Sequence, residues 1–314
     1  MDRSLIGQVR RFNRTVAQRI GALDDKFLSR ARPIGQARLL WEIGVEGSQV
    51  RVLRARLDLD SGYVSRLLRA LEADGLVVVD ADAEDGRVRT ARLTPAGLAE
   101  RAELDSRSDE LAATILHPLS DRQRERLVAA MAEVERLLTA STVRVEVTDP
   151  RHPFARHCLA AYFAELADRF DSGFDPARSI PAEDDDLTPP AGLLLVATLH
   201  DEPVGCGALK FHGDDPTEVK RMWVAPRARG LGLGRRLLAE LEAHAAARGA
   251  HTLHLETNRT LSEAIGLYRA AGYEEVDAFN DEPYAHHWFA KRLSPAGGRP
   301  GRRAASGRGR NSSR

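Results

Sequence analysis

The chain has 314 residues, a length that predicts two domains, each with its own core. Its 46 basic and 46 acidic side chains give a formal net charge of zero, and 43% of its residues are hydrophobic, which excludes a disordered or fibrous protein. No apolar run approaches the roughly 18 residues of a membrane span, and the first residues lack a signal-peptide core. We therefore expect no membrane partner. Because only Cys158 and Cys206 are present, far apart, we predict a cytoplasmic protein without a disulfide framework or metal site.

Residues 4–140 predict a mainly helical region interrupted by one β-hairpin. In the segment 61–73, apolar residues recur at i, i+3, i+4 and i+7, which predicts a helix with one buried face. Two short β-rich runs within 77–93 surround an Asp/Gly turn and predict the hairpin. Thr94 before Pro95 predicts the capped start of the next helix. This order of elements is typical of a mainly α winged helix-turn-helix fold.

The outward face of that helix and the hairpin tip carry side chains suited to DNA. Small hydroxyl groups allow close approach to a groove, and arginines bind guanine edges or phosphates. The candidate DNA-binding residues are Ser61, Gly62, Ser65, Arg66, Arg69, Asp85, Arg87 and Arg89. The alternative is an ordinary solvated face, which the near-neutral balance of residues 1–143 favours, with 23 basic and 22 acidic side chains.

The segment RLLRALEADGLVVV…EDGRVRTARLTPAG resembles the MarR family of bacterial repressors, over about residues 5–140. The resemblance implies a homodimer formed by the first and the last two helices. Such a dimer reads a pseudo-palindromic site in double-stranded DNA through adjacent major grooves. Within the wing, the resemblance implies that Asp85 positions Arg87.

From Val143 the chain alternates strands and helices, which predicts a mixed α/β domain. A strand ending at Val224 is followed by Arg229-x-x-Gly232-x-Gly234, which opens a helix. Glycines let the backbone approach a phosphate, and the free N–H groups of a helix start face an anion. A Walker loop is excluded because Gly-Lys-Ser/Thr is absent. A dinucleotide loop, with Glu256 holding a ribose, is the rival to a diphosphate site, and the chain beyond Glu256 fits it less well.

Residues 143–293 resemble the GNAT acetyltransferase superfamily through that loop and through Asn258…Ala264-Ile265-x-Leu267-Tyr268-x-x-x-Gly272-Tyr273. The resemblance implies an acyl-CoA N-acyltransferase with acetyl-CoA as donor. It further implies that the strand before the loop splays from its neighbour, with the acetyl group and pantetheine in the gap. The implied cofactor-binding residues are Met222, Val224, Arg229, Gly230, Leu231, Gly232, Leu233, Gly234, Arg235, Asn258 and Tyr268.

Direct transfer to an amine requires two proton movements, one from the amine and one to the departing thiolate. Glu218, at the start of the strand before the loop, is the candidate base, and Tyr268 is the candidate acid. A small amine such as an amino acid is the expected acceptor, with Arg169 holding its carboxylate. The candidate acceptor residues are Phe163, Arg169, Phe170, Phe174, Tyr284 and His287.

The sequence therefore predicts a winged helix-turn-helix domain at 1–141, a GNAT-like domain at 142–294 and a disordered Arg/Gly-rich tail at 295–314. The predicted function is a bifunctional transcriptional regulator with N-acetyltransferase activity on a small amine. Two alternatives stay open: a DNA-binding sensor that binds acetyl-CoA or an amine with little turnover, and a protein-lysine acetyltransferase. A nucleic-acid-holding role for the tail is a third open possibility.

Overall fold

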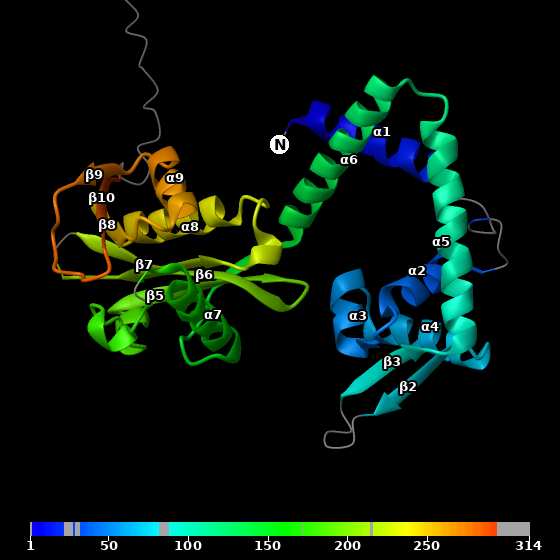
Figure 1. Cartoon of the computed structure of the whole chain (residues 1–314), viewed down its shortest axis with the longest axis horizontal. Coiled ribbons are helices and arrows are strands. Elements are labelled where there is room, and N and C mark those ends of the chain that lie inside the picture. Colours follow the sequence, from blue (N-terminus) through cyan, green and yellow to red (C-terminus); the bar gives the residue numbers. More distant parts are fainter. Residues whose placement is uncertain are drawn as a thin grey trace, which may run out of the picture. The chain divides into compact units, whose positions relative to one another are not determined.

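The computed structural model describes residues 2–21, 28, 32–81, 88–171, 173–213 and 216–293. The chain divides into two compact units, residues 1–138 and 139–314 (Figure 1). The predicted tail at 295–314 and the hairpin-tip residues Asp85 and Arg87 lie outside the described residues.

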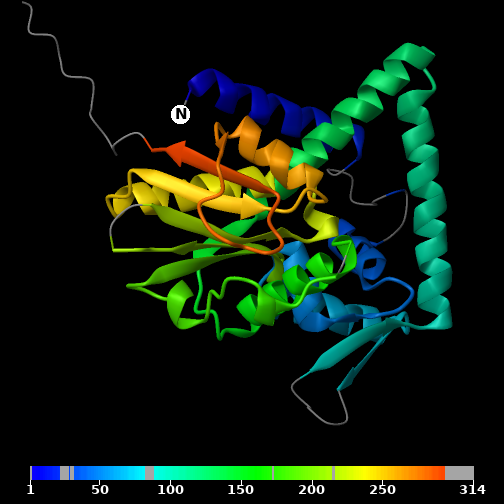
Figure 2. The ribbon, with the colours of Figure 1, turned by 60° about the vertical axis from the view of Figure 1, so that its left-hand side comes forward.

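The first unit consists of helices around a three-stranded antiparallel sheet. Its helices are α1 (Arg3–Arg19), α2 (Ile34–Ile43), α3 (Val50–Leu57), α4 (Ser61–Ala73), α5 (Pro95–Leu116) and α6 (Asp121–Thr142), the last of which runs on past the end of the unit. Its strands are β1 (Ser48–Gln49), β2 (Val77–Ala81) and β3 (Arg89–Leu93), in the order β1-β3-β2. The predicted helix-turn-helix and hairpin are confirmed, and both ribbon views place the hairpin at one end of α5 (Figure 2).

Local sequence explains how these elements begin and pack. The Asp60 side chain caps α4 by accepting from the Tyr63 backbone N–H at 2.8 Å, and the Thr94 hydroxyl caps α5 by accepting from Gly97 N–H at 3.0 Å. The apolar stripe of α4, including Leu68 and Leu71, is buried as predicted. A Cβ at Gly97 would stand only 2.0 Å from the Leu76 carbonyl oxygen, so only glycine lets α5 approach the hairpin this closely.

The second unit is a seven-stranded mixed sheet with helices. The strands are β4 (Arg144–Val147), β5 (Gly192–Leu199), β6 (Glu202–Lys210), β7 (Thr217–Val224), β8 (Thr252–Thr257), β9 (Glu274–Val276) and β10 (His287–Arg292), in the order β4-β5-β6-β7-β8-β10-β9. The helices are α7 (Pro153–Arg169), α8 (Leu233–Ala247) and α9 (Ser262–Ala270), with 3₁₀ turns at Pro176–Arg178, Asp185–Leu187 and Pro226–Ala228. The predicted mixed α/β fold is confirmed.

The core of this unit joins the sheet to its helices. Leu194 and Leu209 of the sheet are fully buried, as is Leu237 of α8, and Cys158 and Cys206 are buried free thiols, as expected of core residues. All strand pairs are antiparallel except β7–β8. Among the described residues, no helix is long and apolar enough to span a lipid bilayer.

Candidate functional site

Two irregularities in β7 open the middle of the sheet. The parallel pairing of β7 with β8 comprises only Thr217–Leu253 and Glu218–His254, so the two strands part beyond this point, as the resemblance implied. On its other side β7 pairs with β6, where Lys220 faces Ala208 and Trp223 faces Cys206. Two residues of β7 thus lie opposite a single residue of β6, which is a β-bulge. Arg221 sits in this bulge with φ at +57°, a left-handed conformation that is unfavourable for a residue with a Cβ. Strain of this kind is often found at functional sites.

A cavity of ≈ 610 Å³ lies beside the splayed end of β7 and the start of α8. The turn before α8 holds Gly230 at φ +81° and Gly232 at φ +75°, and a Cβ on either would meet no atom within 4 Å. The turn therefore leaves open space in front of the first N–H groups of a 15-residue helix, where the helix dipole favours an anion. The observed cradle fits a diphosphate group.

Nine of the eleven predicted cofactor residues line this first cavity: Met222, Val224, Arg229, Gly230, Gly232, Leu233, Gly234, Arg235 and Tyr268. Leu231 does not line it and packs partly buried against the core. Asn258 does not line this cavity but lines a smaller neighbouring one. Its side-chain amide donates to the Tyr284 carbonyl at 2.8 Å, and its oxygen accepts from the Thr260 N–H at 3.0 Å. The first of these hydrogen bonds joins the Asn258 side chain to the loop before β10.

Glu165 of α7 organises the charges of the first cavity, and sequence reasoning missed it. Its carboxylate accepts from Arg229 Nη2 at 2.6 and 2.7 Å, from Trp223 Nε1 at 3.0 Å and from Arg169 Nη1 at 3.2 Å. Arg235, by contrast, forms no ion pair with any other described residue. No local motif announces Glu165, since its partners are up to 64 residues away in the chain.

A second cavity of ≈ 90 Å³ adjoins the first. Six residues line both, which makes the two spaces neighbours across a common wall: Tyr162, Leu166, Met222, Leu261, Ala264 and Tyr268. Burial is the main reason that the pKa of Tyr268 rises above its ordinary value, with the negative charge of Glu256 adding to it. The Tyr268 hydroxyl is therefore protonated throughout the neutral range.

The predicted acceptor residues are divided by the structure. Phe170, Phe174 and Tyr284 line the second cavity and contact one another, with ring centroids 4.9 to 5.7 Å apart. Phe163 stacks on Phe174 at 5.9 Å but lines neither cavity. His287 also lines neither, and its Nδ1 lies 2.6 Å from a carboxylate oxygen of Glu275.

Arg169 lines the first cavity, and its guanidinium already makes three hydrogen bonds. It bonds to Glu165, to Glu263 at 2.8 Å and to the Thr260 carbonyl at 2.8 Å. The hydrogen bond to Glu263 is the main cause that raises the pKa of Arg169. These contacts already satisfy much of the Arg169 guanidinium, and Arg169 lines the first cavity and not the second.

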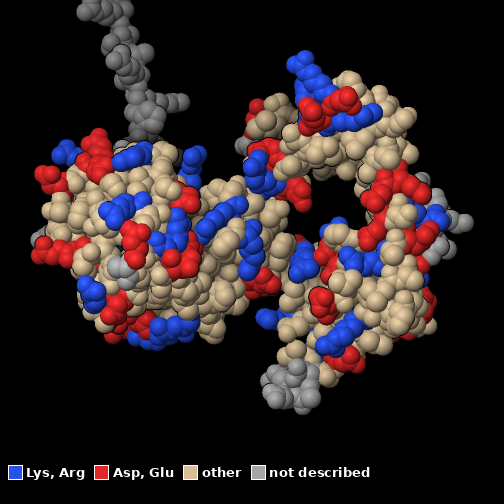
Figure 3. Space-filling view, viewed as in Figure 1, with Lys and Arg blue, Asp and Glu red and all other residues tan. Residues whose placement is uncertain are grey.

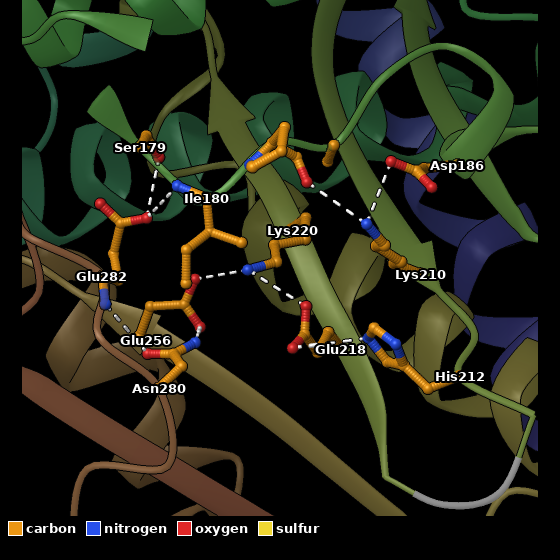
Figure 4. Close-up of polar contacts among 12 residues, drawn as sticks. Ser179, Ile180, Asp186, Lys210, His212, Glu218, Lys220, Glu256, Asn280 and Glu282 are labelled. Carbon is orange, nitrogen blue, oxygen red and sulfur yellow. Dashed lines mark hydrogen bonds and ion pairs between the residues drawn. The ribbon is translucent and has the colours of Figure 1, made fainter. Parts of the chain in front are cut away.

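A chain of polar contacts runs from the protein surface to the second cavity (Figure 4). Lys220 Nζ lies 2.5 Å from Glu256 of β8 and 3.2 Å from Glu218 of its own strand, and Glu218 lies 3.5 Å from His212. Lys220 and Glu256 line the cavity, whereas Glu218 does not. Burial by itself lowers the pKa of Lys220, but the two carboxylates outweigh it and raise the pKa above its ordinary value.

Glu282 is the other carboxylate of the second cavity, and it holds the cavity's wall together. Its Oε2 accepts from the Ser179 hydroxyl at 2.9 Å and from the Ile180 N–H at 2.7 Å, and its Oε1 accepts from the Tyr284 N–H at 3.2 Å. Figure 4 shows this carboxylate joining the segment 179–180 to the late loop before β10. Among the described residues, no group of three or more His, Cys, Asp or Glu side chains is arranged to hold a metal ion.

The first unit presents a separate concave surface. A cavity of ≈ 520 Å³ is bounded by the N-terminal ends of α3 and α4 and by the start of β3. Of the predicted DNA-binding residues, Ser61, Ser65 and Arg89 line it, while Gly62, Arg66 and Arg69 are exposed on α4. Arg51 and Arg54 of α3 also line it and were missed, although their spacing of three already places them on one helix face.

Charge is mixed over the visible surface of each unit, with Lys and Arg interspersed among Asp and Glu (Figure 3). This agrees with the near-zero balance of the whole chain. The concave surface of the first unit differs locally, because the charged residues that line it are all arginines: Arg51, Arg54 and Arg89.

A mixed sheet with a splayed strand, followed by a glycine turn that opens a helix, defines an acyl-CoA N-acyltransferase domain. Residues 159–273 match the Acetyltransferase (GNAT) family, and residues 28–88 match the MarR family. Over 122 residues the chain is 39% identical to an IAA acetyltransferase of Azospirillum brasilense, covering 38% of this chain and 78% of that protein. The chain belongs to the acetyltransferase (GNAT) family and carries a MarR-family winged helix-turn-helix domain, which confirms both resemblances.

Solved structures cover each part separately. An acyl-CoA N-acyltransferase from Klebsiella pneumoniae is 30% identical, covers 48% of this chain and 98% of its own, and has a TM-score of 0.39. A transcriptional regulator from Pseudomonas aeruginosa is 26% identical, covers 41% of this chain and 98% of its own, and has a TM-score of 0.36.

Proposed function

We propose that this chain is a transcriptional regulator that also transfers an acetyl group from acetyl-CoA to the amine of a small molecule. The observation that carries this proposal is Tyr268, which is buried, protonated and common to the walls of two adjoining cavities. The first cavity suits the donor and the second suits the acceptor. Tyr268 lies where the two substrates would meet.

The first cavity supplies the donor site. The Gly230–Gly234 turn and the start of α8 bind the diphosphate, and Arg235 provides an unpaired positive charge beside it. Met222 and Val224 follow the bulge of β7, and their backbone binds the pantetheine arm in the gap left by β8. Acetyl-CoA supplies the acetyl group in activated form, as a thioester.

A carboxylate in the second cavity accepts a proton from the incoming amine. An ammonium group must lose one proton before its nitrogen can attack the thioester carbon. Glu256, rather than the expected Glu218, lines the cavity, so we assign the base role to Glu256, acting directly or through a water. Glu218 lies on the far side of Lys220 and shares that cation with Glu256. In this arrangement Glu218 contacts the exposed side chain of His212.

Tyr268 completes the reaction as the acid. The new C–N bond forms as the C–S bond breaks, and the Tyr268 hydroxyl protonates the departing thiolate. The second amine proton and the proton held by Glu256 pass to solvent, and Tyr268 takes one proton back from solvent. The products are the N-acetylated acceptor and free CoA, with one proton released overall. Because the pKa of Tyr268 is raised, this acid remains available in alkaline solution, and kcat is expected to hold up to about pH 10.

The test is Tyr268→Phe, measured as CoA release from acetyl-CoA over a panel of amino acids, polyamines and a lysine peptide. The expected loss in kcat is about 100-fold or more, with acetyl-CoA affinity unchanged. Tyr273→Phe is the matched control, since Tyr273 is also buried but lines neither cavity. An unchanged kcat in Tyr268→Phe would remove Tyr268 from the chemistry. Acetyl-CoA binding without turnover on any amine would instead favour a sensor.

For the first unit we propose a homodimer that binds double-stranded DNA through α4 and its surroundings. Support comes from an apolar stripe on α1, in which Leu5, Val9, Phe12 and Val16 recur along one face and remain exposed, Leu5 by 62%. Such a stripe normally packs against another surface. The arginines at the concave surface, including Arg51 and Arg54, provide phosphate contacts.

This proposal is tested with a duplex selected from a random oligonucleotide pool. Arg66→Ala is expected to weaken binding about tenfold and to reduce the salt slope by about one, whereas Arg122→Ala on exposed α6 leaves both unchanged. Phe12→Asp is expected to convert the dimer to a monomer in sedimentation, because it places a charge in the apolar stripe. Selection of no sequence by the wild-type chain would contradict DNA recognition.

A further inference from the structure

The charges lining the second cavity leave one cation without a counter-charge. The cavity is lined by two cationic and two anionic side chains: Lys220, Arg221, Glu256 and Glu282. Lys220 and Glu256 form an ion pair, and Glu282 is satisfied by two backbone N–H groups and a hydroxyl. Arg221 forms no ion pair with any described residue. Its guanidinium donates to the Ala182 carbonyl at 3.5 Å and to the Tyr162 hydroxyl oxygen, both uncharged groups.

The surroundings of Arg221 hold its guanidinium at the acceptor side. Its Cζ lies 4.8 Å from the ring centroid of Phe163 and 5.8 Å from that of Tyr162, both on α7. Arg221 lines the second cavity and not the first, whereas the arginines that suit a diphosphate, Arg229 and Arg235, line only the first. An anion bound by Arg221 therefore belongs to the acceptor and not to the donor.

The β-bulge explains why an arginine can serve here. Arg221 is the strained residue of the bulge, and the next residue, Met222, lines both cavities. A carboxylate held by Arg221 would thus lie in the cavity that shares a wall with the first. An amine on the carbon next to that carboxylate would face the same wall, near Tyr268.

We propose that the acceptor is an α-amino acid with a small apolar side chain, whose carboxylate is bound by Arg221. This inference rests on the proposed acetyl transfer and names its substrate class. The small volume of this cavity, ≈ 90 Å³, favours an acceptor with the smallest apolar side chain. The aromatic wall of Phe170, Phe174 and Tyr284 provides an apolar surface for a methyl group.

The test compares alanine and valine with ethylamine and isobutylamine, the same molecules without the carboxylate. The wild-type chain is expected to show a higher kcat/KM for the amino acids. Arg221→Gln should lower kcat/KM for alanine about 10- to 100-fold, the loss of a charge-assisted hydrogen bond, and leave that for ethylamine unchanged. Arg178→Gln is the matched control, since Arg178 lies 5.8 Å from the Tyr284 ring but lines neither cavity.

Three outcomes separate this inference from the proposed function. Equal losses for alanine and ethylamine in Arg221→Gln would overturn it, because Arg221 would then act only in shaping the bulge. Wild-type turnover of ethylamine as fast as alanine would also overturn it, while acetyl transfer itself would stand. If no amine is turned over, calorimetry of alanine and ethylamine with the acetyl-CoA-loaded chain still decides: alanine binding that Arg221→Gln abolishes supports the carboxylate site, and no preference refutes it.

Discussion

The two cavities of the second unit are built in different ways, although they share a wall. The first takes its decisive features from one continuous stretch, the Gly230–Gly234 turn and the start of α8, where backbone N–H groups provide the binding surface. The second is assembled from side chains of α7, β7, β8 and the late loop, which are far apart in sequence. An anion site built from backbone N–H groups tolerates substitution of nearby side chains. A cavity built from distant side chains depends on the contacts between those side chains.

The largest effect is expected at the ion pair that bridges the splayed strands. Lys220→Met leaves Glu256 and Glu218 without their shared cation, and breaking a buried pair from one side typically lowers the free energy of unfolding by about 3–5 kcal/mol. Thermal and urea unfolding would measure the loss. Arg259→Ala, which breaks the exposed pair with Asp171, is the control and should change the melting temperature little.

The same pair gives stability a definite pH dependence. The folded pKa of Lys220 lies above its ordinary value of 10.5, so in this range the unfolded chain binds fewer protons than the folded chain. The contribution of Lys220 is therefore fully present below the unfolded value and is lost as pH rises through the folded one. Stability of the wild type should fall more steeply above about pH 10 than that of Lys220→Met. Parallel curves would show that the pair does not stabilise the strands.

A second effect is expected at the turn of the first cavity. Gly232→Val places a branched side chain in the open cradle at φ +75°, displacing the N–H groups that face the diphosphate. Loss of one or two charge-assisted hydrogen bonds should weaken acetyl-CoA binding about 100-fold in calorimetry. Gly249→Val is the control, because Gly249 has φ +91° and similar open space but does not line the cavity. Equal weakening by both variants would mean that strain, and not the cradle, sets affinity.

The smallest effect is expected at Arg169. Because its guanidinium is already bonded to two carboxylates and a carbonyl, Arg169→Gln should change the KM for an amino acid by less than about threefold. Arg221→Gln, measured alongside, is expected to change it far more. If Arg169→Gln instead raised the KM for alanine and not for ethylamine, the acceptor carboxylate would have to lie at Arg169.

The sequence alone was sufficient for the parts of the protein that rest on neighbouring residues. The buried stripe of α4, the Thr94 cap of α5 and the glycine turn before α8 depend on helical period and on hydrogen bonds a few residues apart. The predicted winged helix-turn-helix and mixed α/β folds follow from these signals. Residues that line the first cavity were found because they lie in one such stretch.

Only the tertiary structure decided which charged side chains are satisfied and which are free. Arg169 is paired with Glu263, 94 residues away, while Arg221 of the β-bulge has no carboxylate partner among the described residues and lines the acceptor cavity. Likewise the register and splay of β7 and β8 put Glu256 on the cavity wall and Glu218 behind Lys220. The physical reason is that ion pairing and burial are set by long-range packing, which the local pattern of residues does not encode.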